Sequence, residues 1–307
     1  MNSPLRRTRG DLIATGVIAG VSALLLGTAF LTAPARDAHL VAAEEEQEDY
    51  GQLAVVPKSF SEGFSLPDTS GRDQPLVASG MVITYNDNTL SATTPEGETV
   101  WTYERPNELC LVDHAWGKVV ATYRDNAGCG DVVAIDAKTG KYAGTRSAIA
   151  PDKVVRLASN DRVGYASSER AEVWRSDLVR TVEYGHVEAK QEPDMQPNEC
   201  TITSALTRTE LVAVTEICDD GAFLRLQEAT PEDSRKPEVL ADAEISPDAY
   251  LVSISQDAAA VYDPTTSEVR GYNTEGTNIS SSSVPQMDSP ELGPDSIVKN
   301  LPVADLP

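Results

Sequence analysis

The feature that most constrains the fold is a repeat of short β-branched runs with a period near forty residues. The runs begin at Val82, Val119, Val163, Leu211 and Leu251, so successive starts lie 37, 44, 48 and 40 residues apart. Each run leads through a polar turn into a second strand-like run, and most copies continue into a third. One such sheet cannot cover both of its faces, so neighbouring units must pack face to face. The spacing predicts an all-β fold, a β-propeller of about five recognisable blades.

The ends of the repeat leave the closure of the propeller open. Residues 53–56 or 64–66 are candidates for an extra strand that completes the ring, and without one the propeller is incomplete. An incomplete propeller has an open edge, which invites pairing with another chain. Four serines at residues 280–283 and several prolines follow the last copy. We expect residues 277–307 to be a disordered tail.

One turn carries a motif found in known repeats. Val-Ala-Ile-Asp-Ala-x-Thr-Gly at residues 133–140 resembles the quinoprotein-type (PQQ-like) propeller repeat. Trp101 stands in an expected third strand, where an aromatic residue pins the blade, and Trp174 is expected in the core. Over roughly residues 50–230 the chain is similar to membrane-anchored propeller proteins of unknown function in actinobacteria. This similarity is carried by residues 66–68, 74–80, 101–105, 108–110, 128–130, 174–177 and 184–185. The resemblance implies a source and an architecture but no activity.

An apolar run without a charged residue occupies residues 12–33, behind Arg6, Arg7 and Arg9. As a helix it spans roughly 33 Å, enough to cross a hydrocarbon core of about 30 Å. Up to residue 36 there are four basic residues and one acid, out of 25 Lys+Arg and 48 Asp+Glu in the chain. This asymmetry predicts a single-pass cell-membrane protein with residues 1–11 in the cytoplasm and its bulk outside it. The alternative is a cleaved signal peptide, because Ala-Pro-Ala at residues 33–35 resembles a cleavage site.

The segment after the apolar run is strongly acidic. We interpret residues 34–52, with the acidic run 44–49, as a self-repelling linker that holds the domain off the membrane. A cation-binding tract is the alternative. The propeller domain is then expected over residues 53–276. The formal net charge of -23 argues against a nucleic-acid partner, which requires a basic surface.

The four cysteines form two matched pairs within the repeat. Counting alone allows three pairings. Asn-Glu precedes both Cys110 and Cys200 closely, while Cys129 and Cys218 follow equivalent strand runs, at separations of 19 and 18 residues. We therefore predict the disulfides Cys110–Cys129 and Cys200–Cys218, each within one blade, as an exported protein can form them. Zinc ligands and redox pairs lie closer together in sequence.

Residues suited to catalysis or metal binding are sparse. Asp113 and His114 offer a base and an orienting carboxylate, although a structural histidine at a strand end is the commoner case. Turns at residues 86–88 and 125–126, the latter with Asp131, offer oxygen ligands for calcium without the spaced acids of an EF-hand loop. No nucleophile elbow, Walker loop, dinucleotide fingerprint or His-Glu-x-x-His motif occurs. We expect no catalytic residue, cofactor or metal.

These features favour a non-enzymatic binding or scaffold module of the cell envelope, whose partner is an envelope or membrane protein. An envelope glycan hydrolase or lyase is the alternative from another class, and a sensor that reports across the membrane is a third. A quinone-dependent dehydrogenase is the weakest alternative, because the resemblance implies much longer chains with adjacent cysteines for that class. The sequence leaves the oligomeric state open.

Overall fold

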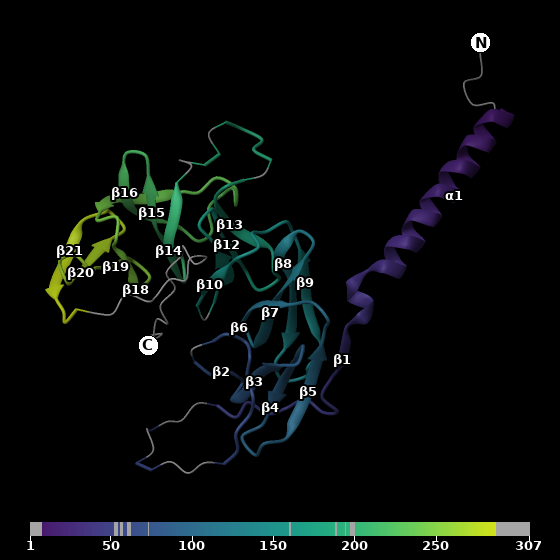
Figure 1. Cartoon of the computed structure of the whole chain (residues 1–307), viewed down its shortest axis with the longest axis horizontal. Helices are drawn as coiled ribbons and strands as arrows, with labels where there is room; N and C mark the ends of the chain where they lie inside the picture. Colours follow the sequence, from purple (N-terminus) through teal and green to yellow (C-terminus); the bar gives the residue numbers. More distant parts are fainter. Residues whose placement is uncertain are drawn as a thin grey trace.

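The computed structural model describes residues 8–51, 55, 58–59, 63–72, 74–159, 161–187, 189–193, 195–196 and 200–286. An N-terminal helix stands apart from a body of short antiparallel strands (Figure 1). The predicted all-β propeller behind one apolar helix is confirmed by this arrangement.

Helix α1 (Arg9–Thr32) is apolar on all sides and buries none of its residues. It begins at a capping box, in which Thr8 and Asp11 each accept a hydrogen bond from the other's backbone N–H. The hydroxyls of Thr28 and Thr32 donate to carbonyls one turn earlier, both at 2.9 Å, so that they need no water. In the part of the chain that the structure describes, α1 alone is long and apolar enough to cross a membrane.

The body consists of five antiparallel sheets of consecutive strands, which we call blades 1 to 5. Blade 1 contains β2 (Leu76–Ala78), β3 (Met81–Asn86), β4 (Thr89–Thr93) and β5 (Thr99–Glu104). Blade 2 contains β6 (Leu109–Ala115), β7 (Lys118–Asp125), β8 (Gly128–Asp136) and β9 (Tyr142–Ser147). Blade 3 contains β10 (Val155–Ala158), β11 (Val163–Ala166), β12 (Arg170–Trp174) and β13 (Arg180–Gly185). Blade 4 contains β14 (Thr201–Arg208), β15 (Leu211–Cys218), β16 (Gly221–Glu228) and β17 (Val239–Ile245). Blade 5 contains β18 (Tyr250–Ile254), β19 (Ala258–Asp263), β20 (Glu268–Asn273) and β21 (Asn278–Ser283).

The first strand of each blade contacts the first strand of the next, from β2 through β6, β10 and β14 to β18. These strands therefore line the axis, and the fourth strands lie on the outside, as in a propeller. Figure 1 shows the blades following one another along an arc in chain order.

The repeat is misaligned by one strand in its fifth copy. The runs at Val82, Val119, Val163 and Leu211 fall at the second strands β3, β7, β11 and β15, whereas Leu251 lies in the first strand β18. The true counterpart begins at Ala258. The alanine-rich start of β19 lacks the β-branched residues of the other second strands. The sequence pattern therefore favours the run before it, at Leu251, as the fifth copy.

Four apolar clusters hold the blades together, one at each junction between consecutive blades. Among the described residues, no such cluster joins blade 5 to blade 1. In β3 of blade 1, buried residues alternate with half-buried ones, whereas every residue of the central strand β12 is buried. Residues 64–66 form no strand, and residues 53, 54 and 56 lie outside the described part. The described blades therefore form an open arc rather than a sealed ring.

The junction between blades 1 and 2 explains the turn motif at residues 133–140. The indole N–H of Trp101, which is buried in β5, donates to the carbonyl of Ala137 at 2.8 Å. Gly140 has a φ of +65°, and a Cβ there would lie 2.5 Å from the Cβ of Trp101. Asp136 closes the turn by accepting from Thr139 N at 2.8 Å. Trp101 thus pins its blade as expected, from the fourth strand rather than the third.

The expected free linker after α1 is docked on the propeller instead. A short 3-10 turn η1 (Pro34–Asp37) leads into β1 (His39–Val41), which pairs with the outer strand β5. Further along, the N–H groups of Ala43 and Gln47 donate to carbonyls of the blade 2 turn, at 3.0 and 3.1 Å. Asp49 lies 3.7 Å from Lys138 of the same turn. Backbone pairing and this cationic turn offset the repulsion within the acidic run.

The predicted disordered tail begins too early. Residues Asn278–Ser283, which include the four serines, form β21 and pair with β20 across blade 5. Serine has little preference for strands, but an outer strand is held by backbone hydrogen bonds to its neighbour. The propeller therefore extends to Ser283, and residues 287–307 lie outside the described part.

Both cysteine pairs lie at bonding distance in the predicted pairing. The sulfur atoms of Cys110 and Cys129 are 2.00 Å apart in blade 2, and those of Cys200 and Cys218 are 1.98 Å apart in blade 4. Each disulfide joins the start of the blade to a strand end beside the turn between its second and third strands, in β8 for Cys129 and in β15 for Cys218. Each disulfide therefore lies within one blade, and neither links one blade to another.

Candidate functional site

The structure does not bring Asp113 and His114 together as a catalytic pair. They are successive residues of β6, and successive side chains of a strand point to opposite faces. The buried Asp113 carboxylate accepts hydrogen bonds from Arg72, at 2.9 Å, and from Arg156. His114 is exposed. Asp113 therefore holds two arginines in place and does not orient a histidine base.

The two acidic turns considered for calcium serve their own chain. Asp87 and Asn88 have positive φ values of 48° and 63°, which Asp and Asn tolerate in turns. Asp125 accepts from Ala127 N at 2.7 Å. Asp131 forms an ion pair with Arg105. In the first turn, Asp87 accepts from the side-chain amide of Asn86 at 2.8 Å and Asn88 from the Tyr85 hydroxyl at 3.4 Å. The oxygens of both turns are thus engaged by neighbouring donors of the protein.

A set of buried and half-buried charges from blades 2, 3 and 4 comes together beside the outer strand of blade 3. Its cations, which we call the arginine cluster, are Arg146 of β9, Arg170 of β12, Arg180 of β13 and Arg235 of the β16–β17 loop. Its anions are Glu172 of β12 and Glu183 of β13. Three blades therefore contribute charge to one region.

Glu172 connects blades 2 and 3, and only 1% of its side chain is exposed. One carboxylate oxygen accepts from Arg146 and from the indole N–H of Trp174, the latter at 2.7 Å. The other accepts from Arg170 at 2.8 Å and from the Tyr165 hydroxyl at 3.2 Å. Burial raises the pKa of Tyr165, so its hydroxyl stays protonated and donates. The Glu172 carboxylate is thus fully occupied.

Glu183 holds the remaining arginines. Its Oε1 lies 2.7 Å from Nη2 of Arg170 and 2.7 Å from Nη1 of Arg180. Its Oε2 lies 3.5 Å from Nε of Arg235. The loop that carries Arg235 is fixed beside β13, because the N–H of Glu183 donates to the carbonyl of Ser234 at 2.7 Å. Blade 4 is thereby latched onto the outer edge of blade 3.

Positive charge exceeds negative charge in this region. Four guanidinium groups face two carboxylates, and none of the four has a further ion pair with a described residue. The Nε atoms of Arg170 and Arg180 are buried without a hydrogen-bond acceptor, and Nε of Arg235 and Oε2 of Glu183 face each other at 3.5 Å without a hydrogen bond. Burial disfavours the charged form of Arg170, but Tyr165 and the two carboxylates outweigh burial and raise its pKa. The arginines therefore remain charged and have donors to spare.

Two hollows adjoin the arginine cluster, and Arg180 lines both of them. The smaller one, which we call the arginine hollow, has a volume of about 210 Å³. It is lined by Arg170, Arg180, Glu183 and Arg235, with apolar walls that include Ile149. The larger one, the rim groove, has a volume of about 840 Å³ and lies between blade 3 and the β16–β17 loop.

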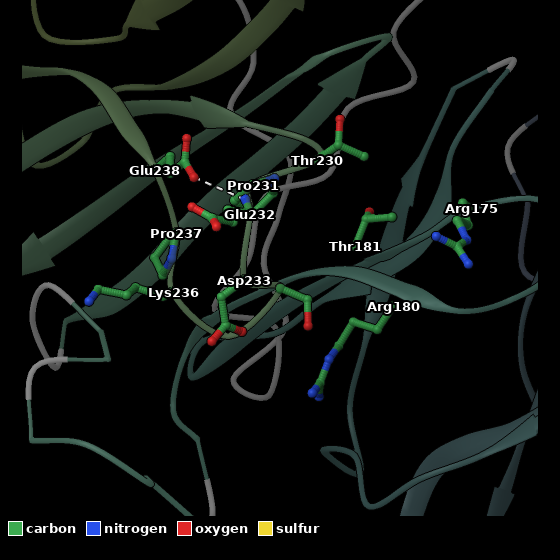
Figure 2. A pocket seen from close by; sticks show the side chains of 11 residues that line it. Arg175, Arg180, Thr181, Thr230, Pro231, Glu232, Asp233, Lys236, Pro237 and Glu238 are labelled. Carbon is green, nitrogen blue, oxygen red and sulfur yellow. Dashed lines mark hydrogen bonds between the residues drawn. The ribbon is translucent and has the colours of Figure 1, made fainter.

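The rim groove carries charges of both signs. Figure 2 shows Arg180 on one side of it and Asp233 and Glu238 on the loop opposite. Two of the three acids of the loop are engaged locally: Glu238 accepts from Glu232 N and Asp233 from Arg235 N, both at 2.9 Å. The groove is therefore a mixed polar surface that opens next to a positive hollow.

Two other buried arginines of the propeller pair with acids. Between blades 1 and 2, Arg105 pairs with Asp131. In blade 4, Arg225 pairs with Glu216 and Asp242. Sequence reasoning missed the arginine cluster, although Arg-Ala-Glu-Val-Trp at residues 170–174 gives a signal, because charges at alternate positions of an apolar strand indicate a buried polar face.

Comparison with known proteins identifies a fold but no family. No protein-family model matches this chain, and no curated protein matches it. The WD40 domain of Toxoplasma gondii coronin is 10% identical with a TM-score of 0.50, over 82% of this chain and 66% of that one. Hsv2 of Kluyveromyces lactis is 14% identical with a TM-score of 0.45, over 69% of this chain and 73% of that one.

These similarities concern the fold alone. The five sheets and their junctions, with the likeness to the coronin domain, define the class of this chain, a β-propeller that carries an apolar N-terminal helix. Its particular role has to be inferred from its own residues.

Proposed function

We propose that this protein is a non-enzymatic binding or scaffold module of the cell envelope, tethered to the membrane by α1 and acting outside the cytoplasm. The observation that carries the proposal is the rim groove, an open polar site on a propeller, two of whose three acids accept hydrogen bonds from their own loop. Such a surface suits recognition, because a catalytic group needs a free side chain aimed at its substrate. The partner class we propose is an envelope or membrane protein.

The tether is supported by the short connection between α1 and the propeller. Six residues separate Thr32 from His39, where β1 begins to pair with β5. A fully extended chain of this length spans about 20 Å. If α1 crosses the membrane, the outer edge of blade 1 lies close to the lipid surface. The propeller is then a membrane-proximal module with restricted reach.

An extracytoplasmic location is supported by chemistry at two places. Two cysteine pairs at bonding distance suit an oxidising compartment. Arg6, Arg7 and Arg9 on the N-terminal side of α1 favour a cytoplasmic N-terminus. The PQQ-like motif at residues 133–140 and the resemblance to actinobacterial membrane-anchored propellers support a role in an envelope.

The enzymatic alternatives find less support. A glycan hydrolase needs two carboxylates that flank its substrate, one of them free to transfer a proton, whereas Asp233 and Glu238 of the groove hold backbone N–H groups. A quinone-dependent dehydrogenase of the implied type stacks its cofactor on adjacent cysteines. Here the two cysteines of each pair lie 19 or 18 residues apart in sequence, with one pair in blade 2 and the other in blade 4.

Site-specific photo-cross-linking of the full chain in its native membrane tests this proposal. A photoreactive residue replaces Thr230, which is exposed in the rim groove, and a control replaces Ser281 on the exposed strand β21. We expect one defined protein adduct from position 230 and none from position 281. Absence of an adduct from position 230, or the same proteins from both positions, contradicts the proposal.

A further inference from the structure

The arginine cluster carries an excess of positive charge. The chain as a whole has a net charge of -23, yet four guanidinium groups here meet only Glu172 and Glu183. A buried charge without a partner is destabilising, so natural proteins pair such charges or use them to bind a ligand. The excess of two positive charges identifies a place for an anion.

The donors left over by the two carboxylates surround one hollow. Arg170 and Arg180 each have an Nε atom that is buried and lacks an acceptor, whereas Nε of Arg235 faces Oε2 of Glu183 at 3.5 Å without a hydrogen bond. All three arginine side chains line the arginine hollow. Only 6% of the Arg170 side chain is exposed. A buried donor without an acceptor loses its bond to water and gains nothing in return. A bound oxyanion supplies the missing acceptors. Glu183 also faces the hollow and holds two of the guanidinium groups in position.

Size and charge together favour phosphate among the oxyanions. The volume of about 210 Å³ accommodates a group of several heavy atoms but not a whole cofactor. A phosphate group carries close to two negative charges at neutral pH, which matches the excess, whereas a carboxylate leaves one positive charge unpaired. Arginine is suited to phosphate, because its planar guanidinium donates two parallel hydrogen bonds.

We propose that the arginine hollow binds the phosphate group of a ligand whose remaining part lies in the adjoining rim groove. Arg180 lines both spaces and therefore joins the two parts of the site. The inference rests on the proposed function, because it names the chemistry that the binding module recognises. It adds a specific anion site to a protein whose overall charge repels anions.

Titration of the full chain in an uncharged detergent with inorganic phosphate tests this inference. We expect saturable binding by calorimetry and broadening of the phosphate signal in phosphorus NMR. Chloride at the same ionic strength should give neither effect. Absence of saturable binding to the unaltered chain overturns the inference, and this result needs no variant that might fail to fold.

Two matched substitutions place the bound phosphate. Arg235→Gln removes one guanidinium of the hollow from a surface loop, and Arg270→Gln removes an equal charge from the partly exposed pair with Glu268 in blade 5. We expect about ten-fold weaker phosphate binding for Arg235→Gln, since a hydrogen bond between charged groups is lost, and unchanged binding for Arg270→Gln. Equal binding by both variants, with unchanged near-ultraviolet circular dichroism, overturns the assignment to the hollow.

The inference and the proposed function fail in different ways. If position 230 gives a defined adduct but phosphate does not bind, the phosphate site is wrong and the binding role stands. If phosphate binds in the hollow but position 230 gives no adduct, the proposed protein partner is wrong and the anion site stands.

Discussion

Glu172 is the single residue on which the junction of blades 2 and 3 most depends. It accepts hydrogen bonds from Arg146, Arg170, Trp174 and Tyr165 while almost completely buried. Glu172→Gln removes its charge and leaves the arginine cluster with one carboxylate. We expect a loss of about 3–5 kcal/mol in the free energy of unfolding, as for other broken buried ion pairs.

Urea unfolding measures this loss, with Glu268→Gln as the control. Glu268 forms a partly exposed pair with Arg270 at 2.8 Å, and such pairs contribute less than about 1 kcal/mol. Equal losses for the two variants contradict the role given to Glu172.

Alanine substitutions at two glycines with similar backbone conformations distinguish the cost of backbone strain from the cost of steric crowding. Gly117 and Gly140 have φ values of +68° and +65°, but only Gly140 faces a neighbour, the side chain of Trp101. Gly117→Ala should cost about 1–2 kcal/mol from the left-handed conformation alone. Gly140→Ala should cost clearly more, because the added methyl also displaces Trp101 from the junction of blades 1 and 2. Urea unfolding midpoints test this order, and a smaller loss for Gly140→Ala contradicts the packing.

Ionisation of Tyr103 lowers the free energy of unfolding as the pH rises through the alkaline range. Burial is the main reason why its pKa is raised to about 12, whereas a tyrosine in an unfolded chain titrates near 10. The unfolded state therefore loses its proton first. The contribution of Tyr103 is intact below about pH 10 and is lost as the pH rises to about 12. Urea unfolding at about pH 9 and about pH 11 should show a smaller loss of stability for Tyr103→Phe than for the unaltered chain. Equal losses contradict the argument.

At the scale of elements, the sequence pattern predicted those strands whose own residues are typical of β-strands. The runs at Val119 and Leu211 were found because β-branched residues favour strands, and they became β7 and β15. Strand β2 has only three residues and is too short to show a period. Strand β1 is flanked by acidic residues and owes its form to pairing with β5. Strand β21 is rich in serine and owes its form to pairing with β20. Tertiary pairing decides such outer strands.

The two disulfides stabilise separate elements. Each closes a loop of 19 or 18 residues within one blade, and such a loop contributes roughly 3 kcal/mol in the chain-entropy model. We expect the double variants C110S/C129S and C200S/C218S each to lose about this amount, with additive losses when combined, because distant sites act independently. Urea unfolding tests this, and peptide mapping that links Cys110 to Cys200 contradicts it.

At the scale of the whole molecule, net charge conceals the site. The value of -23 argues against general binding to nucleic acid, but it does not report a local positive excess that neighbouring blades assemble. Arg146, Arg170 and Arg235 are far apart in sequence and come from three blades. Prediction from sequence requires knowing which outer strands lie side by side, and the blade alignment alone did not supply this.

The blades that the structure describes form an open arc. Four apolar clusters join five blades, and the described residues show none between blades 5 and 1. The inner strands of the two end blades, β2 and β18, therefore lack the contact that β2 makes with β6.

Pulsed electron-spin distance measurement on the full chain tests whether the arc between blade 5 and blade 1 is open. One pair of labels replaces Val77 of β2 and Ser253 of β18, and a reference pair replaces Val77 and Leu111 of β6. All native cysteines are bonded, so the labels attach only at the new positions. An open arc predicts a clearly longer distance for the first pair than for the reference pair. Equal distances mean that blade 5 packs on blade 1 in a closed ring, which contradicts the account.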